Sequence, residues 1–130
     1  MKHRFLTVAA ALLTLLTGIG TCAARTGDFP IRAFHLDFRT EVMTLDAMKS
    51  LVDRISERGI NTLVMEWEAA FPFDKHATLS NASAFTREEV TSFIDYCEGR
   101  GVEVIPLQNC FGHCEYILRH ERYRALREDP

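Results

Sequence analysis

Ionisable and aromatic residues gather where three apolar segments of the sequence end. A histidine and an aspartate close the first segment, two glutamates flank a tryptophan at the end of the second, and a polar run follows the third. In chain order these residues are His35, Asp37, Glu66, Trp67, Glu68, His113 and Glu115. Carboxylates accept hydrogen bonds from hydroxyl groups, and an aromatic face packs against a C–H surface, so the combination suits a pyranose ring.

The spacing of these residues predicts which of them share a side of their strand. Side chains two positions apart on a β-strand point the same way. We therefore expect His35 and Asp37 on one side, and Glu66 and Glu68 on one side with Trp67 opposite. The alternative is a set of ordinary solvated strand ends. Three successive strands that all end in polar residues favour a shared site.

A metal centre is a competing use of the same residues. Cys110, His113, Cys114 and His35 are all possible ligands. The run from Cys110 to Cys114 lacks the second matching pair that a structural zinc set shows, so the sequence predicts no metal. Residues 39–43, which follow the first strand, carry no glycine fingerprint for a nucleotide, and no cofactor is predicted.

The elements that must position these residues alternate between strand and helix. The apolar segments 31–38, 60–67 and 102–107 have the length of buried parallel strands. Thr44 is the expected N-cap of a first helix that Gly59 ends. Thr86 and Glu89 form a capping box at the start of a second helix, which ends at Gly99 and Gly101.

Two further segments connect or follow these elements. Residues 68–85 show no sustained periodicity and are expected to form a long loop, which at this position is usually functional. Residues 115–127 are expected to form a third, polar helix. Its possible inner face consists of Tyr116, His120, Tyr123 and Leu126.

Strand and helix in this order predict an α/β fold with parallel strands and right-handed crossovers. The specific prediction is an incomplete (β/α)8 barrel made of the first three βα units. A closed barrel typically takes about 250 residues, so 130 residues would hold under half of one. A doubly wound sheet is the alternative, which the missing nucleotide fingerprint disfavours.

Composition and the N-terminal residues predict an exported protein. The formal net charge of -3 makes nucleic acid an unexpected partner. Residues 1–24 have a basic head, an apolar run and small residues, as a bacterial signal peptide has, and the run is too short for a transmembrane helix. Residues 25–130 would then form the mature domain, periplasmic, extracellular or anchored by a lipid at Cys22. The other three cysteines, Cys97, Cys110 and Cys114, are expected to be small buried thiols, with one bridge as the alternative.

Three motifs in order resemble those of family 20 glycoside hydrolases, in particular the hexosaminidase D type. They are Ile31 to Asp37, Glu66 to Phe73, and Ile105 to His113 with the segment 115–120 behind. The resemblance spans roughly residues 31–128. It implies the N-terminal part of a (β/α)8 barrel that removes terminal β-linked N-acetylhexosamine with retention, the substrate's acetamido oxygen being the nucleophile.

The resemblance also implies roles for single residues. An Asp–Glu pair supplies the acid and its partner in that family, and we expect it beyond residue 130, since no Asp–Glu dipeptide occurs in this sequence. Arg32 matches an arginine that holds sugar hydroxyls, although strand alternation places it opposite His35 and Asp37. His113 matches a histidine near the catalytic centre. A non-catalytic sugar-binding barrel remnant and a metal-dependent barrel enzyme are the alternative functions.

Overall fold

Three parallel strands and two long helices form the body of the molecule. The computed structural model describes residues 29–129, so the expected signal peptide and the expected lipid anchor at Cys22 lie outside the described residues. The sheet has the order β1-β2-β3, with β1 at Ala33–Asp37, β2 at Thr62–Glu66 and β3 at Glu103–Leu107. Both pairs are in register, so that Asp37, Glu66 and Leu107 stand side by side where the strands end.

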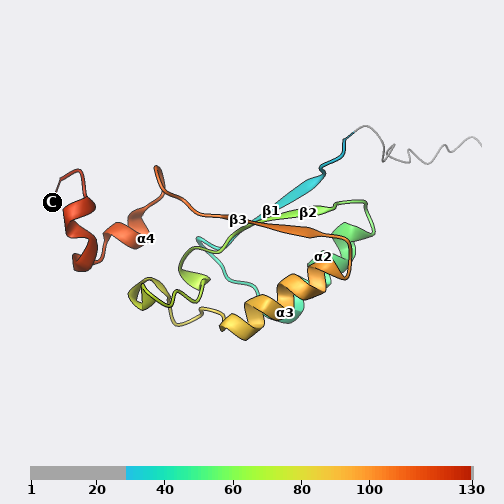
Figure 1. Ribbon diagram of the computed structural model, residues 1–130, viewed down its shortest axis with the longest axis horizontal. Coiled ribbons are helices and arrows are strands. Elements are labelled where there is room, and N and C mark those ends of the chain that lie inside the picture. Colours follow the sequence, from blue (N-terminus) through green and yellow to red (C-terminus); the bar gives the residue numbers. More distant parts are fainter. Residues whose placement is uncertain (1–28, 130) are drawn as a thin grey trace, which may run out of the picture.

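The helices α2 and α3 lie together on one face of the sheet (Figure 1). Helix α2 spans Leu45–Ser56 and begins where the Thr44 side chain accepts a hydrogen bond from the backbone N–H of Ala47. Helix α3 spans Arg87–Glu98 and begins with the capping box expected of Thr86 and Glu89. Each cap satisfies backbone groups that the first turn leaves unpaired. A doubly wound sheet would carry helices on both faces, whereas a barrel carries them on its outside alone.

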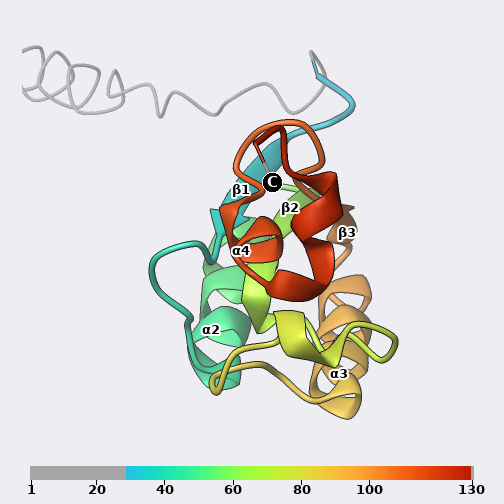
Figure 2. The same cartoon turned by 90° about the vertical axis from the view of Figure 1, so that its left-hand side faces the viewer.

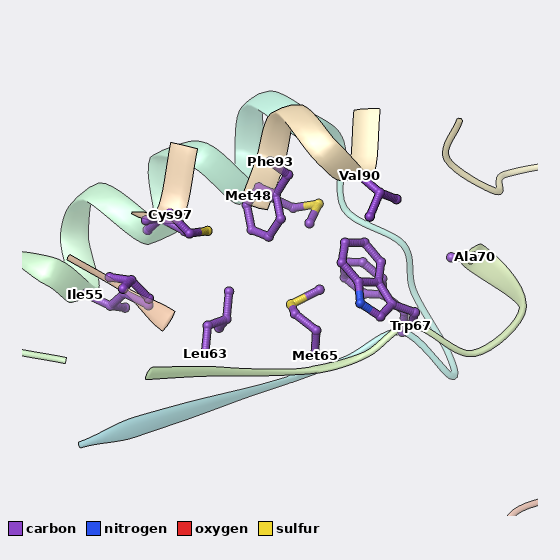
Figure 3. Close-up of a cluster of buried hydrophobic side chains, with 12 residues drawn as sticks. Met48, Ile55, Leu63, Met65, Trp67, Ala70, Val90, Phe93 and Cys97 are labelled. Carbon is purple, nitrogen blue, oxygen red and sulfur yellow. The ribbon is translucent and has the colours of Figure 1, made fainter. Parts of the chain in front are cut away.

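Alternation along β2 separates the core from the other face of the sheet. Leu63, Met65 and Trp67 point toward the helices and are buried there (Figure 3). The same core contains side chains from α2 and α3, namely Met48, Val52, Ile55, Val90, Phe93 and Cys97. Burial raises the pKa of the Cys97 thiol to about 11. The prediction of a buried thiol is thus confirmed for Cys97, while it is wrong for Cys110, which is exposed; Cys97, Cys110 and Cys114 are all free thiols.

A polar network joins the two helices on their outer side. The Tyr96 hydroxyl of α3 donates a 2.8 Å hydrogen bond to the Asp53 carboxylate of α2. This bond raises the pKa of Tyr96, and burial adds a smaller contribution. The Arg100 side chain donates to the same carboxylate and stacks on the Tyr96 ring, 4.3 Å from its centroid. These contacts fix the helix pair that supports the sheet.

The segment after β2 is more ordered than the sequence predicts. It contains two 3-10 turns, η1 at Glu68–Ala70 and η2 at Ala77–Leu79, and Ala70 and Leu79 are buried. Backbone bonds tie it to itself, because Asn81 and Phe85 donate to the carbonyls of Ala69 and Ala70. The loop is therefore a packed part of the molecule.

The prediction of a single third helix over residues 115–127 is wrong. Only Glu115–Leu118 forms α4, and after an extended His120 the chain continues as the 3-10 helix η3, Glu121–Leu126. Tyr123 forms a 2.6 Å hydrogen bond with His76 of the loop after β2, and it is buried, whereas Leu126 of the expected inner face is exposed. This tertiary contact outweighs the local helical preference. Figure 2 shows α4 and η3 in front of the carboxyl ends of the strands.

No helix within residues 29–129 is both long and apolar enough to cross a bilayer.

We expect Phe93→Ala to lower the free energy of unfolding by about 3–5 kcal/mol, because it empties the centre of the core between α3 and the sheet. Phe111→Ala is the matched control, since Phe111 is fully exposed and its removal should change stability by less than about 0.5 kcal/mol. Urea unfolding followed by circular dichroism measures both values. Equal losses in the two variants would contradict the placement of the core.

Candidate functional site

The Glu66 carboxylate lies at the centre of the polar end of the sheet. Its side chain is 5% exposed, and three neighbours neutralise or bind it. His35 Nε2 lies 3.0 Å from one carboxylate oxygen, and Arg39 Nε lies 3.2 Å from the other. Asn109 Nδ2 donates to that second oxygen at 2.5 Å. A buried carboxylate needs such partners, and these come from the ends of β1 and β3 on either side of β2.

Asp37 is held by the residue two positions after it. Its carboxylate accepts a 2.8 Å hydrogen bond from the backbone N–H of Arg39. It also forms an ion pair with the Arg39 guanidinium, at 2.6 Å. The Arg39 hydrogen bond lowers the pKa of Asp37. Arg39 therefore links Asp37 to Glu66, since its guanidinium reaches both carboxylates.

Glu68 is the second buried carboxyl group at this end. It begins η1 with a backbone φ of 51°, in the left-handed region that residues with a Cβ rarely adopt. Its carboxylate accepts a 2.6 Å bond from the same Asn109 nitrogen that serves Glu66. Burial raises the pKa of Glu68, and the nearby Glu66 charge adds to that shift, against the opposing Asn109 bond.

A cavity of about 340 Å³ opens beside Glu68. Arg39 forms one wall, and the segment after β3 supplies the rest, namely His113, Glu115, Tyr116 and Arg119. Burial raises the pKa of the Tyr116 hydroxyl, which accepts a 2.8 Å bond from the Gln108 amide. The lining thus combines acids, cations and an aromatic hydroxyl, a set that can donate to and accept from a polyhydroxylated ligand.

Most of the residues expected at the site are brought together. His35, Asp37, Glu66 and Glu68 form one network with Arg39, while His113 and Glu115 share the cavity with Glu68. Alternation accounts for the first set, because Ala33, His35 and Asp37 pair in register with Thr62, Val64 and Glu66 on one face.

The expectation that Arg32 faces the ligand is corrected by the structure, because Arg32 lies at the opposite end of the sheet. It precedes β1, and its guanidinium donates to the backbone carbonyls of Gly59 and Phe29. Its own backbone N–H donates to the Asn61 side chain at 2.9 Å. Arg32 therefore lies at the amino end of β1, as its position before Ala33 requires, and Arg39 lies at the polar end.

The expectation that Trp67 packs against a sugar is also corrected by the structure. Its indole is on the side opposite Glu66 and Glu68, as alternation predicts, but that side is the core and the residue is 5% exposed. Its ring meets those of Phe38, Phe85 and Phe93 edge to face, at centroid distances of 6.0, 5.8 and 6.1 Å. The tryptophan therefore packs behind the strand, in the core, and is not part of the polar network around Glu66.

Two residues of the network were missed from the sequence. Arg39 follows Asp37 by two positions, and this local spacing is a signal for a side chain that folds back on an aspartate. Asn109 belongs to the polar run after the third strand, which predicts an amide at this end, but its partners Glu66 and Glu68 are more than 40 positions away and have no local signal. Within residues 29–129 no three His, Cys, Asp or Glu side chains are grouped so as to hold a metal ion.

We expect Glu68→Gln to be more stable than the wild type at neutral pH. The pKa of Glu68 is raised in the folded state, so the stability that this group contributes is fully present below its unfolded pKa and is lost as pH rises through the folded pKa. The variant should lack this loss. Urea midpoints from about pH 4 to pH 8 measure it, with Glu41→Gln, an exposed glutamate, as control. A wild-type curve parallel to that of Glu68→Gln would contradict the burial of the charge.

Comparisons with known proteins give two relatives in sequence and one in fold. No protein family model matches the chain. It is 30% identical to hexosaminidase D of Bos taurus over 99 residues, which are 75% of this chain and 29% of that protein. It is also 30% identical to hexosaminidase D of Homo sapiens over 101 residues, 77% of this chain and 21% of that protein. The chain thus spans under a third of the length of these relatives.

A solved structure shows the same fold. The chitobiase of Flavobacterium johnsoniae superposes with a TM-score of 0.65 at 23% sequence identity, over 70% of this chain and 15% of that one. The likeness confirms the predicted fold class, three βα units of an incomplete (β/α)8 barrel. The chain is therefore a relative of the hexosaminidase D proteins in sequence and of the family 20 chitobiase barrel in fold, over the part that it shares with them.

Proposed function

We propose that this chain forms the sugar-holding rim of a glycoside hydrolase that removes terminal β-linked N-acetylhexosamine from glycoconjugates. The observation that carries the proposal is the pair of buried glutamates at the end of β2, bound by Arg39 and Asn109 next to a cavity. Barrel enzymes place their sites at this end of the strands. The relation to two proteins named hexosaminidase D supports the same substrate class.

The described residues are suited to binding and orienting a sugar. The Glu68 carboxyl group can accept a hydrogen bond from a hydroxyl, and Arg39 and Arg119 can donate to ring substituents. Tyr116 adds a ring and a hydroxyl at the cavity wall. Glu66 is enclosed by its three partners, so its part is to hold Arg39 and Asn109 in place.

The chemical step in this proposal is retaining and assisted by the substrate. The acetamido oxygen of the sugar attacks the anomeric carbon, an acid protonates the leaving oxygen, and a neighbouring aspartate stabilises the acetamido group as it becomes positive. No Asp–Glu dipeptide occurs in the 130 residues, so the proposal assigns both groups to sequence beyond residue 130.

N-Acetylglucosamine should bind to the chain near Glu68 and Tyr116, and glucose, which lacks the acetamido group, should bind more weakly. Backbone amide NMR shifts during titration with each sugar measure this. Arg39→Ala should weaken binding by about tenfold, through the loss of a charged hydrogen-bond donor.

Arg87→Ala is the matched control, because Arg87 forms an exposed ion pair with Asp74 away from the cavity. It should leave the affinity unchanged. Identical shifts with both sugars, or shifts confined to residues outside the cavity, would refute the proposed site.

A non-catalytic sugar-binding role is the second candidate, and the missing Asp–Glu dipeptide favours it for the 130 residues taken alone. We expect no release of the aryl group from an aryl N-acetyl-β-glucosaminide by this chain. A longer product of the same reading frame that contains the pair should release it. Turnover by the 130-residue chain would show that its acid lies among the residues described above.

A further inference from the structure

One amide nitrogen connects the two buried glutamates. Asn109 Nδ2 lies 2.5 Å from Glu66 Oε1 and 2.6 Å from Glu68 Oε1. A primary amide carries two N–H bonds, so it can donate one to each carboxyl group. Because both oxygens share a single nitrogen, the two carboxyl groups are held side by side although their charges repel.

The surroundings of the two groups are unequal. Glu66 also faces His35 at 3.0 Å and Arg39 at 3.2 Å, so its negative charge is balanced. Glu68 is almost as buried, and its carboxyl group accepts a hydrogen bond from Asn109. Of the two, within the described residues, Glu66 forms an ion pair with Arg39, so a proton shared between these neighbours resides on Glu68.

The backbone of Glu68 needs a restraint. A φ of 51° is unfavourable for a glutamate, so the side chain is held where it is by contacts rather than by backbone preference. The other charged groups facing it come from both sides. Asp37 and Arg39 belong to the end of β1, and His113, Glu115 and Arg119 belong to the segment after β3. The uncharged side chain of Asn109 donates to both glutamates.

We propose that Asn109 is a positioning residue that holds Glu66 and Glu68 as a pair in which Glu66 keeps the charge and Glu68 keeps a proton facing the cavity. A protonated Glu68 can donate an O–H bond to a carbonyl or hydroxyl oxygen of a ligand, in addition to accepting one. The identity of that ligand as an N-acetylhexosamine rests on the proposed function, while the pairing itself does not.

The first experiment measures the pKa of Glu68 in the full chain by carboxyl ¹³C NMR, with the signal assigned by Glu68→Gln. The wild type should titrate above the ordinary range of a glutamate. In Asn109→Leu the released side chain should turn toward solvent, and its pKa should fall toward the ordinary value. If Asn109 were only a donor to a carboxylate fixed by other contacts, its loss would raise the pKa further. A rise, or no change, overturns the proposal.

Two further variants separate positioning from general damage. Gln108→Leu removes the neighbouring amide, which bonds Tyr116 and not the glutamates, and should leave the pKa of Glu68 unchanged. Glu66→Gln removes the partner charge and should lower the pKa of Glu68 even if Asn109→Leu fails to fold. An unchanged value in Glu66→Gln overturns the pairing.

A binding arm tests the ligand separately. The affinity for N-acetylglucosamine should fall by about tenfold as pH rises through the titration of Glu68, and Glu68→Gln should remove this dependence. If the NMR titrations give the expected pKa values but neither the wild type nor Glu68→Gln binds the sugar, the pairing is supported and the proposed function is refuted. A pH dependence that persists in Glu68→Gln overturns the assignment of the proton to Glu68.

Discussion

Glu66 is a carboxylate on the central strand with almost no contact with solvent, and its need for partners organises the polar end of the sheet. A charge in such a place is unfavourable unless cations and hydrogen-bond donors surround it. The chain supplies one partner from within β1, a second from the turn after it, and a third from the loop after β3, namely His35, Arg39 and Asn109. One buried group thereby fixes three separate segments relative to each other. Two of these segments, the turn after β1 and the segment after β3, line the cavity beside Glu68.

The sequence predicts the scaffold well because its periodicities are local. Three strands, two capped helices and their order follow from apolar patterns and from Thr44, Thr86 and the glycines that end the helices. The side of the strand taken by His35 and Asp37 follows from the same alternation. What cannot be predicted locally is the C-terminal segment, where the His76–Tyr123 hydrogen bond joins residues 47 positions apart and replaces a regular helix.

The site is predicted less completely than the fold, for a related reason. Strand ends reveal the acids, but they do not reveal which arginine or amide reaches them. The resemblance implies a sugar contact for Arg32, which lies at the amino end of β1. Arg39 and Asn109 instead reach the glutamates from neighbouring segments. Trp67 shows the other limit, because an aromatic residue between two acids is equally suited to a sugar and to a core. Its burial among four phenylalanines places it in the core.

The alternation along β2 has a consequence for how such a protein can diverge. Leu63, Met65 and Trp67 face the helices and contribute to stability, while Thr62, Val64 and Glu66 face the other way, and Glu66 belongs to the polar end of the sheet. Neighbouring positions of β2 are therefore under different constraints, one set for packing and the other for recognition. A lineage can exchange its polar set for another ligand while its packing set stays the same, so homologues of low overall identity can retain one architecture and differ in specificity.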